Sequence, residues 1–126
     1  MIRALVFDFD GVIVDTESPY VEAWEQLHRE AGLTPPRRLA HALVGHVALD
    51  LDLWVAFGPQ ANRARLQARF ASEARARNLR QPVLPGVREL IDEARAAGRR
   101  LAVASNSDEA QVVGHLRSRG LLPLFD

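Results

Sequence analysis

The chain has 126 residues, of which 48% are hydrophobic and 25% are charged, and its formal net charge is zero. This length suits one ordinary domain with its own core, and the balanced charge gives no reason to expect nucleic acid or an anionic membrane as partner. The absence of cysteine excludes disulfides and thiolate metal sites. No apolar stretch approaches the length needed to span a membrane, so we expect a cytoplasmic protein.

The chain opens with an apolar run that leads into two acids. Apart from Arg3, residues 2–7 are aliphatic or aromatic, which predicts a β-strand buried on both faces. Alternate side chains of extended backbone share a side, so Asp8 and Asp10 should converge, and Gly11 allows a sharp turn. Neighbouring carboxylates repel each other unless a cation lies between them, so the pattern predicts a magnesium site. In the simpler alternative, the acids begin a turn or cap a helix.

Four helical segments are predicted next, and together they would form a small bundle over residues 17–81. Ser18 followed by Pro19 is typical of a helix start with Ser18 as the N-cap. Trp24 and Trp54 are expected to be core anchors rather than substrate contacts. The four segments are expected from Ser18 to Gly32, from Pro35 to Gly45, from Val47 to Phe57, and from about Gln60 to Leu79.

Core character returns at about residue 83. A helix over residues 87–97 should turn Leu90, Ile91 and Ala94 inward. The apolar residues 101–104 predict a second buried strand.

The second predicted strand ends in polar residues, Ser105-Asn106-Ser107, before Asp108 caps a last helix. The order of elements predicts an α/β fold with a parallel sheet, whose chemistry lies at the carboxyl ends of the strands. Residues 1–16 and 82–126 would form this core. Ordinary turn and cap roles are the alternative for these polar residues.

The segment from Asp8 to Glu17 has the pattern DxDGxxxDxE and resembles the first motif of the haloacid dehalogenase superfamily. This form is typical of the branch with β-phosphoglucomutase-like proteins and small-molecule phosphatases. The strand that ends at Ser105 resembles the second motif. The resemblance implies a partial Rossmann-like core with an inserted helical cap bundle.

The same resemblance implies Mg²⁺-dependent hydrolysis of a small phosphate monoester. Asp8 would attack phosphorus to give an aspartyl-phosphate, and Asp10 would act as general acid and base. Both residues would contribute to the metal site. The phosphate or substrate contacts implied by the motifs are Gly11, Ser105, Asn106 and Glu17.

A mutase that transfers the phosphoryl group is less favoured than a phosphatase. Tyr20 stands where the mutase branch carries a histidine, and Gly45-His46-Val47-Ala48 stands where that branch has a Gly-x-Ser-Arg element.

The family's two later motifs, a basic residue and an acidic pair, normally lie beyond the point that corresponds to Asp126. We therefore expect a C-terminally truncated core with an unpaired strand edge, to be covered by a missing C-terminal segment or a second copy. An inactive or regulatory remnant stays open as an alternative. A receiver-type signalling domain is a third possibility, which the inserted helices disfavour.

Overall fold

The computed structural model describes residues 1–44 and 50–126 of the chain. The chain divides into two compact units. The first consists of Met1–Asp15 together with Gln81–Asp126, and the second is Thr16–Arg80. The segment Gly45-His46-Val47-Ala48, which stands where the mutase branch has a Gly-x-Ser-Arg element, lies among residues 45–49, outside the described residues. No helix within the described part is long and apolar enough to cross a membrane.

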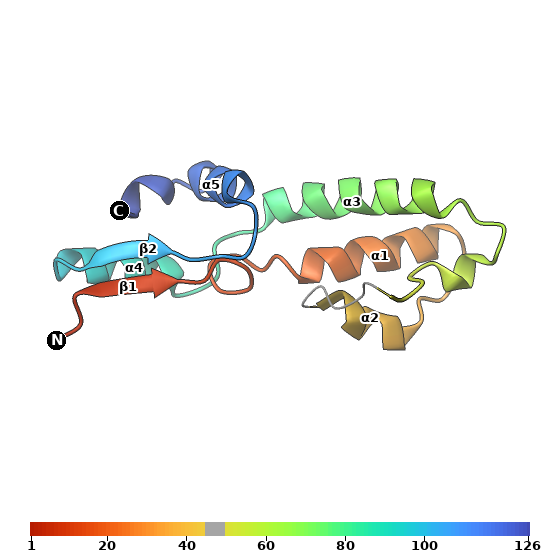
Figure 1. Ribbon diagram of the computed structural model, residues 1–126, viewed down its shortest axis with the longest axis horizontal. Coiled ribbons are helices and arrows are strands. Elements are labelled where there is room, and N and C mark those ends of the chain that lie inside the picture. The colour runs from red at the N-terminus through yellow and green to blue at the C-terminus, as the bar shows by residue number, and fades with distance from the viewer. Residues whose placement is uncertain (45–49) are drawn as a thin grey trace. The chain divides into compact units, whose positions relative to one another are not determined.

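A two-stranded parallel sheet is the centre of the first unit (Figure 1). Pairing runs from Ala4 opposite Arg100 to Phe7 opposite Val103, so both strands end at the same edge. The elements of this unit are β1 (Ala4–Phe7), α4 (Val87–Ala96), β2 (Arg100–Val103), α5 (Glu109–Ser118) and the 3₁₀ helix η3 (Leu122–Leu124). Asp108 caps α5, as predicted, because its carboxylate accepts a bond of 3.2 Å from the Gln111 amide.

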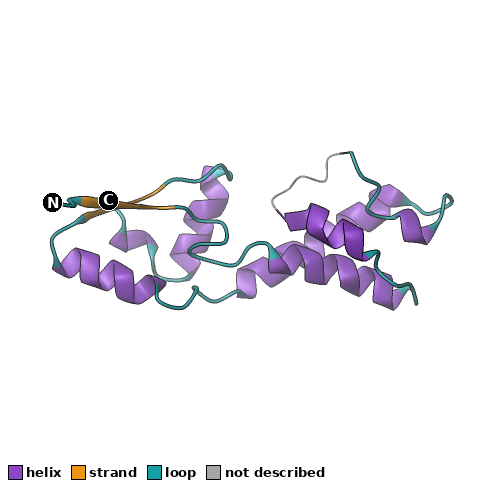
Figure 2. Ribbon diagram, turned by 90° about the horizontal axis from the view of Figure 1, so that it is seen from below, coloured by secondary structure: helices purple, strands orange, loops and turns teal. Residues whose placement is uncertain are grey.

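The prediction that the first strand is buried on both faces is wrong. Phe7 is buried, but Val6 on the opposite face is 66% exposed, and Ile2 before the strand is 62% exposed. The helix α4 covers one side of the strands (Figure 2). Among the described residues the sheet has only two strands, so β1 lacks a second neighbour, and nothing described covers Val6.

The core of the first unit lies between this sheet and its helices. Phe9, Ile13 and Val14 follow β1 and are buried, together with Leu101 of β2. On α4, Ile91 and Ala94 are fully buried as predicted. Leu90 is 45% exposed, so its predicted inward position is wrong; the neighbouring Val87 and Ile91, one turn apart, form the buried stripe instead.

The second unit is helical. It contains α1 (Ser18–Glu30), α2 (Arg37–Leu43), the 3₁₀ helix η2 (Val55–Phe57) and α3 (Arg63–Arg80). Ser18 is the first helical residue and Glu17 takes the N-cap position, so the predicted cap is displaced by one residue. The third predicted helix is also wrong for its described part, because residues 50–54 form turns and only η2 is helical there.

An aromatic cluster fills the core of the second unit. Trp24 and Trp54 are both buried, as predicted, and Phe70 packs against Trp54 with ring centroids 5.8 Å apart. The Trp24 indole N–H donates to the Leu53 carbonyl at 2.9 Å. His28 is fully buried beside Trp24, with ring centroids 4.5 Å apart. Its Nδ1 lies 2.9 Å from the Trp24 carbonyl, which can only accept, so Nδ1 carries the proton.

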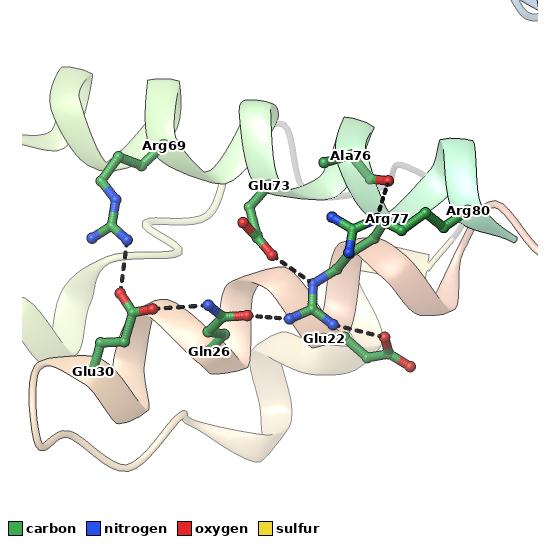
Figure 3. A network of polar contacts seen from close by, with 8 residues as sticks. All are labelled: Glu22, Gln26, Glu30, Arg69, Glu73, Ala76, Arg77 and Arg80. Atoms are coloured by element: carbon green, nitrogen blue, oxygen red, sulfur yellow. Dashed lines mark hydrogen bonds and ion pairs between the residues drawn. The ribbon is translucent and has the colours of Figure 1, made fainter.

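Polar side chains join α1 to α3 outside this core (Figure 3). Glu30 accepts from Arg69 at 2.7 Å, and Glu22 accepts from Arg77 at 3.1 Å. Arg77 also donates to Gln26. Hydrogen bonds from Gln26 and Arg69 lower the pKa of the Glu30 carboxyl. Exposed ion pairs each contribute little, so the aromatic core is the main source of stability here.

Burial along α4 predicts a large difference between two adjacent aliphatic side chains. Replacing Ile91 with alanine leaves a cavity in the core of the first unit, and we expect it to lower the free energy of unfolding by about 2–5 kcal/mol. Leu90→Ala is the matched control, because this exposed side chain should cost no more than about 0.5 kcal/mol. Urea denaturation followed by circular dichroism measures both. Equal losses would contradict the helix orientation described here.

Candidate active site at the ends of the two strands

A tight turn directly after β1 shapes the acidic segment. The amides of Val12 and Ile13 donate to the Phe9 carbonyl at 3.2 and 3.0 Å, and the Gly11 amide donates to the Val14 carbonyl at 2.8 Å. Gly11 has φ of 72°, a conformation that glycine adopts at little cost. Phe9 is 1% exposed and anchors the turn in the core. The turn is therefore fixed by backbone bonds and by one buried ring.

The two acids lie on either side of this anchor in the sequence. Asp8 is exposed and Asp10 half-buried, whereas Phe9 between them points into the core. One carboxylate oxygen of Asp8 accepts from the Phe9 amide at 2.7 Å. Asp8 and Asp10 therefore lie outside the core, on the two sides of a buried residue; the predicted convergence of their carboxylates stays a prediction.

The end of β2 meets the acidic segment. The Ala104 amide donates to the Phe7 carbonyl at 2.8 Å, which continues the parallel pairing one residue beyond the strand. Just past this point the Ser105 hydroxyl donates to Asp10 Oδ2 at 3.2 Å. The structure thus brings together residues that are 95 positions apart in the sequence.

Ser107 is a site residue that the sequence analysis left out. Its hydroxyl donates to the same Asp10 oxygen at 2.6 Å, and its amide donates to Ser105 Oγ at 3.1 Å. Because Ser105 Oγ accepts from that amide, its own proton is directed toward Asp10. The sequence spacing could have indicated Ser107. It lies two residues after Ser105, and alternate side chains of extended backbone lie on the same side.

The other predicted contacts are Asn106, Gly11 and Glu17. Asn106 is exposed, and no polar contact of its side chain is found among the described residues. Gly11 has no side chain to bind a ligand, and its positive φ shapes the turn after β1. Glu17 belongs to the second compact unit, at the start of α1, where its carbonyl accepts from the Tyr20 amide at 3.0 Å.

The donor set for a metal consists of two carboxylates. Within residues 1–44 and 50–126, no group of three or more histidine and acidic side chains is positioned to hold a metal ion. Mg²⁺ is commonly held by one or two carboxylates, with water and phosphate oxygens completing its shell. Asp8 and Asp10 therefore fit Mg²⁺ as a minimal protein donor set.

Arg119 and His115 form a second polar cluster, which binds the chain at Gln81, where it re-enters the first unit. Arg119 donates through Nε and Nη2 to the Gln81 carbonyl at 3.0 and 2.8 Å. Its Nη1 lies 3.0 Å from His115 Nδ1, which must accept because arginine only donates. The His115 ring packs on Phe9 with centroids 5.5 Å apart. Burial, and then the Arg119 charge, lower the pKa of His115, while Asp10 acts in the opposite direction.

This cluster predicts a loss of stability in mild acid. The pKa of His115 in the folded chain lies below its ordinary value of 6.5, so the unfolded chain binds more protons as the pH falls through that value. We expect the difference in free energy of unfolding between the parent and His115→Gln to shrink as the pH falls below 6.5. Urea titrations across pH 5–8 measure it, and His41→Gln, at an exposed site, should keep the parent profile. A difference that does not vary with pH would contradict the prediction.

Comparison with known proteins identifies the class to which this fold and site belong. The haloacid dehalogenase-like hydrolase family matches residues 2–126. The chain belongs to this family, as its motifs predicted. The predicted fold class, an α/β core with a parallel sheet and inserted helices, is confirmed.

Particular relatives are named as phosphatases. The chain is 32% identical to "Putative phosphatase YhcW" of Bacillus subtilis, over all of this chain and 59% of that protein. It is 32% identical to hexitol phosphatase B of Escherichia coli K12, over 84% of this chain and 50% of that protein. A solved structure titled as a putative β-phosphoglucomutase from Thermotoga maritima is 26% identical with a TM-score of 0.80, over 99% of this chain and 59% of that one. The chain thus spans less than two thirds of each relative.

Proposed function

We propose that the protein hydrolyses a phosphate monoester of a small metabolite, with Asp8 as nucleophile and Asp10 as general acid and base. The convergence of Asp10, Ser105 and Ser107 where β1 and β2 end is the observation that carries this proposal. Membership of the hydrolase family and the phosphatase names of the relatives support the reaction class.

In the first step, a carboxylate oxygen of Asp8 attacks phosphorus and the bond to the ester oxygen breaks. Asp10 gives its proton to that oxygen, so the alcohol leaves neutral and an aspartyl-phosphate remains. In the second step, water attacks phosphorus, Asp10 takes a proton from the water, and the Asp8 carboxylate is released with phosphate.

Asp8 and Asp10 would hold Mg²⁺, which when bound offsets the repulsion between a carboxylate and a phosphate dianion. The chain's own donors complete the site. The Ser105 hydroxyl can redirect its proton from Asp10 to an oxygen of the transferring group. Its oxygen stays in place because it accepts a hydrogen bond from the Ser107 amide, which does not involve Asp10. Such donors stabilise the charge that develops on equatorial oxygens.

Residues 17–81 would serve as the cap and residues 1–16 and 82–126 as the catalytic core. The division into the units Thr16–Arg80 and Met1–Asp15 with Gln81–Asp126 supports this assignment. Glu17, the N-cap residue of α1, would be a substrate contact. Among the described residues β1 pairs only with β2, so its other edge is open to pairing with a further strand.

The test of the proposal is hydrolysis of p-nitrophenyl phosphate with Mg²⁺. The chain is assayed alone and with a polypeptide corresponding to the part of YhcW that it does not cover. The aspartyl-phosphate should be detectable as phosphate bound to the protein and released by hydroxylamine. Asp8→Asn should abolish both turnover and this bound phosphate, because the asparagine amide is not a nucleophile. Asp92→Asn, a change in an exposed helical acid, is the matched control.

Two results of this assay would decide against the proposal. Turnover that persists in Asp8→Asn would exclude the assigned nucleophile. No turnover and no phosphate labelling with the added polypeptide would favour a non-catalytic or regulatory remnant of the family instead.

Ser107 provides a finer test of the same site. We expect Ser107→Ala to lower kcat by about tenfold with a smaller change in KM, because Asp10 loses its shorter hydrogen bond. Ser107→Thr keeps a hydroxyl and should restore most of the loss. Ser118→Ala, which removes a hydroxyl from the far end of α5, should leave kcat unchanged. A failure of threonine to rescue would contradict a role for the hydroxyl.

A further inference from the structure

The charges around α1 are matched on one side and unmatched on another. Toward α3, the carboxylates of Glu22 and Glu30 each meet an arginine, Arg77 and Arg69 (Figure 3). Between α1 and α2 the second unit instead has a cavity of about 350 Å³ with a surplus of basic groups. Its polar and small lining residues are Glu25, Arg29, Thr34, Arg37, Ala40 and His41.

Helical spacing builds the two walls of this cavity. Glu25 and Arg29 lie one turn apart on α1, and Arg37 and His41 lie one turn apart on α2, so each pair shares a face. Ala40 leaves room between the α2 side chains. The rigid backbone of Pro35 borders the cavity beyond α1. The positions of the basic groups are therefore set by regular elements.

Only one acid offsets the basic groups. Glu25 lies 3.4 Å from Arg29, and the two side chains are 38% and 61% exposed, so water weakens this pair. The side chains of Thr34, Arg37 and His41 have no hydrogen bond or ion pair with any residue that the structure describes. A hydroxyl, a guanidinium and an imidazole thus line one cavity, all three on exposed residues and without a side-chain partner among the residues that the structure describes.

The carbonyl groups at the C-terminal end of α1 should repel an anion less than free carbonyls would, because some of them accept hydrogen bonds. The His28 carbonyl accepts from the Leu33 amide at 2.9 Å, and the Arg29 carbonyl accepts from the Gly32 amide at 3.0 Å. These bonds occupy two of the last carbonyls of the helix.

We propose that this cavity is a second ligand site that binds the phosphoryl group of a small molecule or inorganic phosphate. Guanidinium forks and a hydroxyl donate to phosphate oxygens from several directions, and the charge surplus favours a dianion. The volume of about 350 Å³ lies at the lower end of the range of roughly 300–1,000 Å³ for small-molecule sites. All of its lining residues belong to the second unit, whereas Asp8 and Asp10 belong to the first.

Residue-resolved NMR of the ¹⁵N-labelled full chain, titrated with inorganic phosphate and separately with phenyl phosphate, tests the proposal. Saturable shifts of the Thr34 and Ala40 amides are expected. Arg37→Gln should weaken the affinity at least tenfold, which corresponds to about 1.4 kcal/mol. Arg38→Gln is the matched control, because Arg38 is adjacent and does not line the cavity.

The two probes and a further variant separate the possible outcomes. Tighter binding of phenyl phosphate assigns an organic phosphate, and equal binding assigns the free ion; both support a phosphoryl site. Ser105→Ala, at the strand ends, should leave these shifts unchanged, so that failure of the catalytic proposal and failure of this one remain distinct. Equal weakening by Arg37→Gln and Arg38→Gln, equally strong binding of acetate, or no saturable shift at millimolar phosphate would overturn the proposal.

Discussion

The parallel pairing of β1 with β2 is the constraint on which the candidate site depends. Phe7 lies opposite Val103, and the next backbone bond, from Ala104 to Phe7, fixes the level at which both strands end. A shift of the register by one residue would move Ser105 away from Asp10 and turn alternate side chains to the wrong face. The acidic turn adds a second restraint, since Phe9 is held in the core while its neighbours leave it.

Much of this arrangement was predictable because local patterns and the family motif pointed to the same place. Two apolar runs that end in polar residues indicate parallel strands with chemistry at one edge, and Asp108 is a recognisable cap. Ser107 was missed because a polar residue in a turn has many ordinary uses. Its role depends on a contact across 97 positions, which no local pattern encodes.

The errors have physical causes as well. The run at residues 2–7 is apolar enough for a strand buried on both sides, yet Val6 is exposed because burial depends on which neighbours are present. Leu90 and Ile91 are equally apolar, and only packing against β2 decides which of them faces the core. The cavity between α1 and α2 follows from helix placement, whereas the sequence alone shows only that arginine is abundant.

We propose above that the ends of β1 and β2 form one site for a divalent ion and a phosphoryl group. The most direct measurement is paramagnetic broadening of amide signals by substoichiometric Mn²⁺, added in place of Mg²⁺. We expect broadening that is strongest at residues 8–11 and 105–107 and is competed away by Mg²⁺. Broadening at only one of the two strand ends, or broadening centred elsewhere in the chain, would contradict the account.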